Sequence, residues 1–171
     1  MTRSLVFACL LLLAGCSPSP VQQPKGDKVR ACLEELAAGG GDWITFSVTY
    51  DDSHGLHGGL TLTVHGDGRV DQRAIRFEAR EPRPVSKPDL ERLLALLREV
   101  KGWEQRIPER QAMPDESPIR LTVRCGTNEG KIWEWYNDMP ENARISRVRD
   151  LMTQIAWQPK GGPVVIRKET R

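Results

Sequence analysis

Residues 44–50 read Ile-Thr-Phe-Ser-Val-Thr-Tyr, and residues 60–65 read Leu-Thr-Leu-Thr-Val-His. Apolar and polar side chains alternate in both stretches, which is typical of strands that bury one face. A Gly-Asp-Gly sequence at 66–68 is typical of a tight turn, so residues 69–78 are expected to return as a third strand. The pattern predicts an antiparallel meander in which the apolar side chains of the first strand, Ile44 included, point toward the core.

Three other segments have apolar residues at the spacing of amphipathic helices. Residues suited to cap their N-termini precede them: Asp27, the pair Ser86 and Asp89, and the pair Asp138 and Glu141. One face of each helix is apolar: Val29, Cys32, Leu33 and Leu36 in the first; Leu90, Leu93, Leu94, Leu97 and Val100 in the second; Ile145, Val148, Met152 and Ile155 in the third. The first helix is expected to end before the glycines at 39–41, and the last before Pro159.

A second hairpin is expected between the last two helices. Residues 119–125 alternate again, residues 127–130 are expected to turn, and residues 131–136 to return. Because strands and helices are segregated, the sequence predicts an α+β fold. Its antiparallel sheet has about five strands, with two long helices on one face plus a short N-terminal helix, in the order α-βββ-α-ββ-α. We expect one domain over residues 27–159.

The amino terminus has the pattern of an export signal. Arg3 precedes an apolar run at 5–13, which is much shorter than the roughly 20 residues needed to span a bilayer, and Leu13-Ala14-Gly15-Cys16 follows. This segment resembles the bacterial lipoprotein signal, whose lipobox is matched at residues 13–16. The resemblance implies that residues 1–15 are removed and that the Cys16 thiol carries a diacylglyceryl group, usually with a further acyl chain, such as palmitate, on its amino group.

The same resemblance implies a place in the cell. The protein is expected to be lipid-anchored in the bacterial cell envelope, and Ser17 after the lipidated cysteine implies the periplasmic face of the outer membrane in enteric-type bacteria. Residues 16–26 are rich in proline and are expected to form a tether, and residues 160–171 a basic flexible tail. The order of elements also resembles lipoprotein domains of unknown function, through residues 60–70 and 86–97, which implies no activity.

Composition limits the classes of partner and the chemistry of the cysteines. The formal net charge is only +2, which together with export argues against a nucleic-acid partner. Of four cysteines, Cys9 lies in the signal and Cys16 is the lipidation residue, so the domain retains Cys32 and Cys125. These two form a disulfide in an oxidising compartment, or remain as two buried thiols.

One loop contains candidate metal ligands. Residues 51–59 include Asp52, His54 and His57, and carboxylate and imidazole groups are ligands of zinc and similar metals. Zinc needs three or four ligands, and His65 lies too far along the next strand to complete the shell. The alternative is that these are ordinary solvated loop residues, with glycines at 58–59 that relieve the turn.

Trp133 and Trp135 share one face of a strand. Either they pack beneath a helix or they form an exposed aromatic patch, since tryptophan is enriched at binding hot spots. The sequence has no Gly-x-Ser-x-Gly and no phosphate-binding loop. Its acidic pairs, Asp51-Asp52 and Glu34-Glu35, are adjacent in sequence and do not indicate the two facing carboxylates of a hydrolase. We therefore expect a non-enzymatic binding module without a cofactor, with an unknown envelope protein or ligand as partner. The alternatives are a metal-binding or metal-dependent envelope protein and an inhibitor of a secreted hydrolase.

Overall fold

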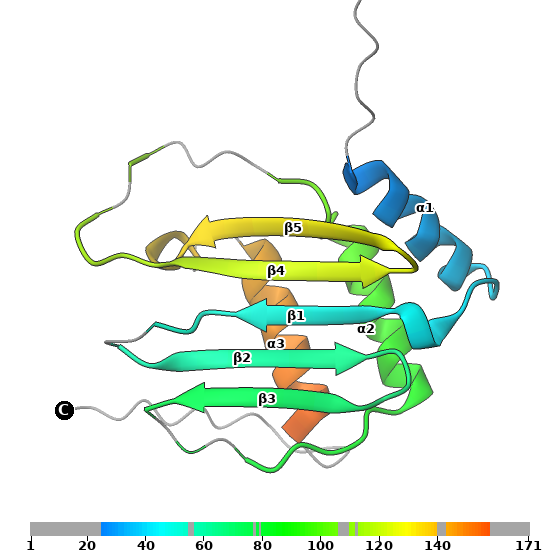
Figure 1. Cartoon of the computed structure of the whole chain (residues 1–171), viewed down its shortest axis with the longest axis horizontal. Helices are drawn as coiled ribbons and strands as arrows, with labels where there is room; N and C mark the ends of the chain where they lie inside the picture. The colour runs from blue at the N-terminus through cyan, green and yellow to red at the C-terminus, as the bar shows by residue number, and fades with distance from the viewer. Residues whose placement is uncertain are drawn as a thin grey trace, which may run out of the picture.

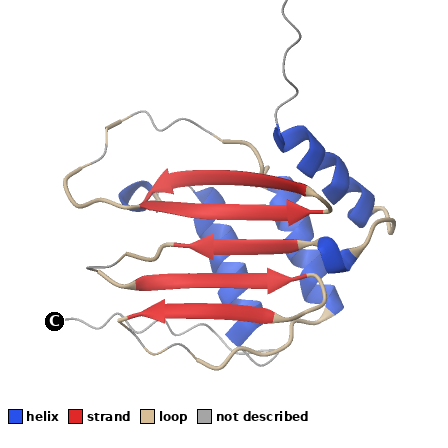
Figure 2. Cartoon of the chain, in the orientation of Figure 1, coloured by secondary structure: helices blue, strands red, loops and turns tan. Residues whose placement is uncertain are grey.

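A five-stranded antiparallel sheet and the helices that pack on one of its faces make up the described part of the chain (Figures 1 and 2). This computed structural model describes residues 25–54, 57–76, 78, 80–105, 110–111, 113–139 and 143–157. The predicted signal at 1–15, the predicted lipobox with Cys16, most of the predicted tether and the predicted tail at 160–171 lie outside the described residues. Within the described ranges, no helix is long and apolar enough to cross a membrane.

Two hairpins lie side by side in the sheet. The strands are β1 (Ser47–Asp51), β2 (Gly59–His65), β3 (Val70–Ile75), β4 (Pro118–Cys125) and β5 (Asn128–Trp135). Their spatial order is β3-β2-β1-β4-β5, so β1 pairs with β2 on one side and with β4 on the other, both antiparallel. The α+β class and the antiparallel five-stranded sheet are therefore confirmed.

Three α-helices occur among the described residues, and two short 3₁₀ helices accompany them. They are α1 (Lys25–Ala37), η1 (Trp43–Thr45), α2 (Lys87–Glu99), η2 (Tyr136–Asp138) and α3 (Ala143–Trp157). The prediction of one short and two long helices does not match, because α1 and α2 each contain 13 residues. The 3₁₀ helices also add to the predicted order of elements.

The first helix begins earlier than predicted. It includes Lys25 and Gly26, so the predicted tether at 16–26 and domain start at 27 are two residues late. A Cβ on Gly26 would lie 2.9 Å from the carbonyl oxygen of Trp103, so this glycine allows α1 to approach another segment closely. Asp27 therefore lies in the first turn, where its charge suits the helix dipole.

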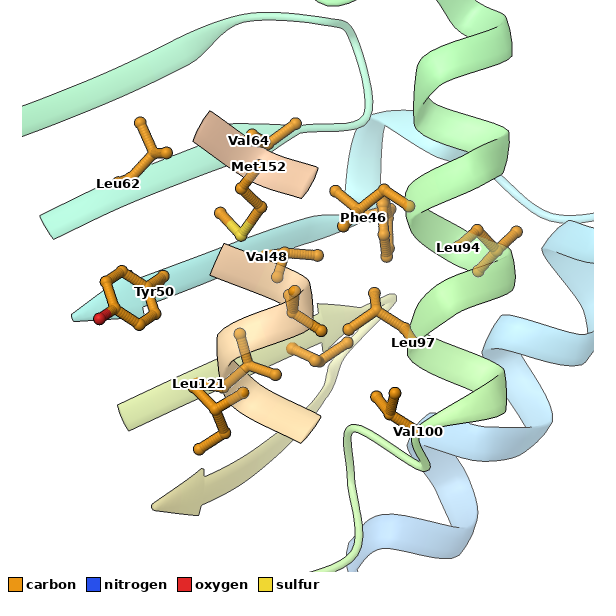
Figure 3. Packing of buried hydrophobic residues seen from close by; sticks show 14 of the residues in the cluster. Phe46, Val48, Tyr50, Leu62, Val64, Leu94, Leu97, Val100, Leu121 and Met152 are labelled. Atoms are coloured by element: carbon orange, nitrogen blue, oxygen red, sulfur yellow. The ribbon is translucent and has the colours of Figure 1, made fainter. Parts of the chain in front are cut away.

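The core lies between the sheet and the helices (Figure 3). The side chains of β1, β2 and β4 alternate between buried and half-buried or exposed, as their sequences predict. Leu93 and Leu97 of α2 are fully buried, as is Met152 of α3. Removing such apolar surface from water contributes about 25 cal/mol per Å² and is the main force that holds the helices on the sheet.

The predicted start of the first strand is wrong. Ile44 is 77% exposed and lies in η1, because the Asp42 side chain accepts a hydrogen bond from the Ile44 N–H at 2.9 Å and caps that turn. The strand β1 begins only at Ser47. A local capping bond thus prevails over the period-two pattern at this point.

Two other boundaries also differ. The third strand was expected to reach residue 78, but β3 ends at Ile75 because Arg76 has a φ of 64°, in the left-handed region. The turn of the second hairpin was expected at 127–130, but β5 begins at Asn128, which pairs with Cys125. The turn therefore contains only Gly126, with a φ of 60°, and Thr127.

Capping residues fix α2 at both ends. Ser86 is the N-cap, and its hydroxyl donates to Asp89 at 2.7 Å, as the spacing predicts. At the other end, the Arg144 guanidinium from α3 donates to the carbonyl oxygens of Val100 at 2.9 Å and Lys101 at 2.8 Å. A cation at a helix C-terminus is favourable, so Arg144 links α3 to the end of α2.

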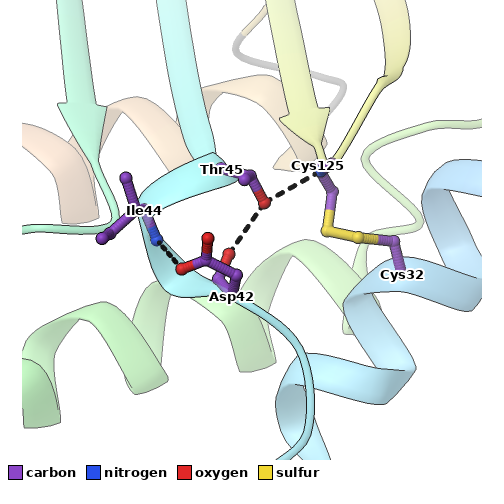
Figure 4. Close-up of a disulfide and its surroundings, with 6 residues drawn as sticks. Cys32, Asp42, Ile44, Thr45 and Cys125 are labelled. Carbon is purple, nitrogen blue, oxygen red and sulfur yellow. Dashed lines mark hydrogen bonds between the residues drawn. A yellow bond between two sulfur atoms is a disulfide. The ribbon is translucent and has the colours of Figure 1, made fainter.

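Cys32 of α1 and Cys125 of β4 are joined by a disulfide (Figure 4). Their Cα atoms lie 5.9 Å apart, within the usual range for such a bond. Beside it, the Thr45 hydroxyl accepts a hydrogen bond from the Gly126 N–H at 3.2 Å. The disulfide attaches the first helix to the turn end of the second hairpin, because Cys125 is the last residue of β4.

Replacing both Cys32 and Cys125 by serine is expected to lower the free energy of unfolding by about 4 to 5 kcal/mol, because the bond closes a loop with a sequence separation of 93. Urea unfolding under oxidising conditions measures the loss. A reductant should cause the same loss of stability in the unmodified protein, and it should leave the stability of the double variant unchanged. An unchanged unfolding midpoint in the double variant would contradict a stabilising role.

Candidate functional site

The face of the sheet opposite the helices is uncovered by any described helix or strand (Figure 2). Cross-strand pairing aligns its side chains in rows. Three rows cross the strands: Arg73, Thr61, Asp51, Arg120 and Trp133; Asp71, Thr63, Thr49, Thr122 and Lys131; and His65, Ser47, Arg124 and Glu129. We call these residues, with Trp135 beside the first row, the open face.

Trp133 and Trp135 lie on the open face, so the interpretation that they pack beneath a helix is wrong. The register of the hairpin places Ile132 and Glu134 on the buried side and the two tryptophans on the other. Their rings meet edge to face with centroids 5.1 Å apart, and both side chains are partly exposed. The arrangement favours the alternative of an accessible aromatic patch.

Side chains outside the sheet hold this patch in place. The Gln105 amide donates to the Trp133 carbonyl at 3.0 Å and accepts from the Trp133 N–H at 2.7 Å, which satisfies part of the β5 edge. The guanidinium carbon of Arg110 lies 6.0 Å from the centroid of the Trp135 ring. Such a cation above an indole face is attracted to its π electrons. The two indoles are therefore a fixed feature of the surface.

The carboxylates of the open face are engaged by neighbouring groups. Asp71 binds Arg69 at 2.5 Å and His65 at 2.8 Å, and these contacts hold the pKa of its carboxyl below the usual value. Glu129 binds Lys131 at 2.7 Å and Arg124 at 2.6 Å, with the same effect on its pKa.

Asp51 has a different set of partners. Its Oδ1 accepts hydrogen bonds from the Ser53 N–H at 3.0 Å, the Ser53 hydroxyl at 2.5 Å and the Thr61 hydroxyl at 3.1 Å. Arg73, at one end of the first row, and Arg120, next to Trp133 at the other end, have no ion pair or side-chain hydrogen bond with any described residue. Alternation in β4 was the signal that could have identified Arg120 as an outward residue.

A pocket of about 540 Å³ lies at one end of the sheet. Three segments distant in sequence form it: the loop between β1 and β2, the segment before β4, and η2. Its lining includes all three candidate metal ligands, Asp52, His54 and His57, together with Glu116 and Tyr136. Its volume is in the range of small-molecule sites.

Asp52 has a structural role in this pocket. It accepts the Tyr50 hydroxyl at 2.6 Å on one oxygen and the Leu60 N–H at 2.6 Å on the other. Burial, followed by the neighbouring Asp52 charge, raises the pKa of the Tyr50 hydroxyl above its usual value. The tyrosine is therefore a hydrogen-bond donor that anchors the loop to β1.

His54 and His57 lie side by side. Their rings stack with centroids 4.7 Å apart, and Nδ1 of His54 accepts the His57 N–H at 3.2 Å. Among the described residues, no group of three or more histidine, cysteine, aspartate or glutamate side chains is arranged to hold a metal ion. The structure thus brings the candidate ligands near one pocket without assembling a coordination shell from them.

A partly buried charge network borders the pocket. Arg110 donates to both carboxylate oxygens of Glu116, at 2.7 and 2.6 Å, and to Asp138 at 2.9 Å. Asp138, which the spacing with Glu141 suggested as a cap of α3, lies in η2 and binds Arg110, whereas α3 is described from Ala143; Glu141 lies outside the described residues. No local pattern in the sequence could have identified this network.

Comparison of the chain with protein-family models, curated proteins and solved structures found no match. The geometry of this chain offers an open sheet face with two tryptophans and with two arginines that have no ion pair with any described residue, and a polar pocket beside that face.

Glu116→Gln is expected to reduce the acid sensitivity of the protein. Hydrogen bonds from Arg110 lower the pKa of the Glu116 carboxyl from 4.5 to about 2, so its ionised form stabilises the fold. That contribution is complete above pH 4.5 and is lost as the pH falls toward about 2. Urea unfolding across this range should show a smaller loss of stability in the variant.

Glu81→Gln is the matched control, because Glu81 is exposed and forms no ion pair among the described residues. It should retain the full acid sensitivity of the unmodified protein. Equal pH dependence of the Glu116→Gln variant and the unmodified protein would contradict the role given to the Arg110 contact.

Proposed function

We propose that the protein is a non-enzymatic interaction module, anchored to the bacterial cell envelope by lipid on Cys16. The match of residues 13–16 to a lipobox supports the anchor. A disulfide between Cys32 and Cys125 supports an oxidising compartment such as the periplasm, because such bonds are rare where thiols are kept reduced.

The single observation that carries the proposed activity is the open face. One side of the sheet is covered by helices, and the other presents Trp133 and Trp135 beside Arg120, which has no ion-pair partner among the described residues. Tryptophan and arginine are the residues most enriched in binding hot spots. The partner is an envelope component that contacts this face.

The local chemistry supports a non-enzymatic role. Ser53, next to His54 in sequence, donates its hydroxyl to the Asp51 carboxylate at 2.5 Å. Asp52, the carboxylate nearest the two histidines in sequence, already accepts two hydrogen bonds within the fold. These hydrogen bonds give Ser53, Asp51 and Asp52 a structural role in the described part of the loop.

The anchor is tested by the mass of the mature protein isolated from membranes. The unmodified protein should begin at Cys16 and carry acyl chains, whereas Cys16→Ser should lack them, because only the thiol can form the thioether. Cys9→Ser is the matched control and should be acylated normally, since Cys9 lies in the segment that is removed. An unacylated Cys16 in the unmodified protein would contradict the anchor.

The binding surface is tested by photo-crosslinking in cells, with the crosslinking side chain placed at one of three sites. Thr122 lies at the centre of the open face, His57 in the loop beside the pocket, and Ala95 on the exposed side of α2. We expect an adduct with an envelope component from position 122, and none from position 95. An adduct from position 57 alone would favour the inhibitor alternative, in which the loop enters a foreign active site.

Alanine at both His54 and His57 distinguishes the metal-dependent alternative. A module that binds through its open face should keep the adduct from position 122 in this double variant, whereas a metal-dependent protein should lose it. Trp133→Ala with Trp135→Ala should reduce the adduct yield about tenfold or more, as expected when hot-spot side chains are truncated. Loss of the adduct in the histidine variant would contradict the proposal.

A further inference from the structure

The open face lies close to the point where the anchor joins the domain. The helix α1 begins at Lys25, and Gly26 packs against Trp103. Trp103 in turn packs on Gly130 of β5, the strand that carries Trp133 and Trp135. The chain from Cys16 therefore enters the domain at the edge strand β5 from the helix side of the sheet, and Trp133 and Trp135 lie on the other side of the same strand.

This connection is short. Nine residue steps separate Cys16 from Lys25, which limits the distance between them to about 30 Å. Two groups that are linked within such a distance have an effective concentration of about millimolar toward each other. A surface of the domain with only weak affinity for lipid would therefore remain in contact with the membrane.

The composition of the open face suits a membrane interface. Tryptophan is enriched at the level of lipid headgroups, where its ring is amphipathic, and lysine and arginine are attracted to anionic headgroups. Five cations and three carboxylates belong to the face and its margin: Arg69, Arg73, Arg120, Arg124 and Lys131 against Asp51, Asp71 and Glu129. These carboxylates are all engaged, and the two charges of the set that have no ion-pair partner among the described residues, those of Arg73 and Arg120, are both positive.

The opposite surface of the molecule differs. On the outer side of α2 and α3, a shallow groove carries equal numbers of cationic and acidic residues. Arg147 binds Glu99 at 2.8 Å, and Arg92 binds Asp89 at 2.9 Å. No described tryptophan lines this groove. This groove therefore lacks both the tryptophans and the excess of cations that the open face presents.

We propose that the open face lies against the anionic headgroups of the membrane in which Cys16 is anchored. This inference rests on the proposed lipid anchor and identifies the envelope component that faces Trp133 and Trp135 as the lipid surface itself. The tryptophan rings sit among the headgroups, and Arg120, Arg73 and Lys131 contact their phosphates. The helix layer then faces away from the membrane.

Tryptophan fluorescence tests the inference with the mature lipidated protein reconstituted in vesicles that contain an anionic lipid and a brominated lipid. Bromine quenches indoles that reach the membrane. We expect quenching in these vesicles, and its loss when Trp133 and Trp135 are both replaced by alanine; Trp43, Trp103 and Trp157 provide the residual signal. High salt or a purely zwitterionic vesicle should weaken the quenching.

A charge variant keeps the test valid if the tryptophan variant fails to fold. Arg120→Glu with Lys131→Glu leaves both tryptophans in place and should remove most of the quenching. The matched control, Arg92→Glu with Arg147→Glu, makes the same charge change on the helix layer and should leave it intact. Circular dichroism and the presence of the Cys32–Cys125 disulfide verify that each variant is folded.

Different results overturn different claims. Unquenched tryptophans in the lipidated protein would overturn the membrane contact while leaving the anchor intact. The membrane contact would also be overturned if the variant without Trp133 and Trp135 were quenched as strongly as the unmodified protein. The same holds if the two charge variants lost quenching to the same extent. An acidic polyglutamate peptide that binds the open face as strongly as anionic vesicles do would identify a polypeptide partner instead. Absence of acyl chains on Cys16 would instead refute the proposed anchor.

Discussion

The alternation of apolar and polar side chains along the sheet is the constraint on which the rest of the structure depends. Val48 and Tyr50 on β1, like Leu121 on β4, are fully buried, and their neighbours along each strand face the other way. A sheet with one apolar face must cover that face, and α1, α2 and α3 do so. The polar face then has no need of a cover, so the same alternation that builds the core also creates the surface available to a partner.

Specific long-range contacts fix the helices on that apolar face. The Cys32–Cys125 disulfide attaches α1 to β4, and Arg144 joins α3 to the carbonyl end of α2. On the far side of the sheet, Gln105 and Arg110 hold the tryptophan pair from outside β5. The core and the open face are therefore positioned by the same rigid hairpin, β4 with β5, and a partner that binds one side meets a surface that is already organised.

Sequence patterns predicted most of the fold, because most elements obey local rules. Ser86 caps α2 as its spacing with Asp89 requires, and the leucines of that helix are buried as their periodicity indicates. The predictions fail where a polar contact outweighs the local pattern. The Asp42 side chain caps η1 and so places Ile44 outside β1, and Asp138 lies in η2, where it binds Arg110. The candidate ligands at 52–57 were correctly placed near one another, but only the structure revealed that Asp52 is already bound to Tyr50 and Leu60.

Residue type and spacing along the chain are enough to recognise the lipobox match, the period of each strand and the amphipathic helices. They are also enough to identify Cys32 and Cys125 as the two cysteines that could pair. Tertiary structure alone decided that the pair is bonded, that Glu116 meets Arg110, and that Trp133 and Trp135 face outward beside Arg120. The physical reason is that these contacts join segments distant in sequence. Their distances depend on strand register and on which face the helices cover, and no local pattern carries that information.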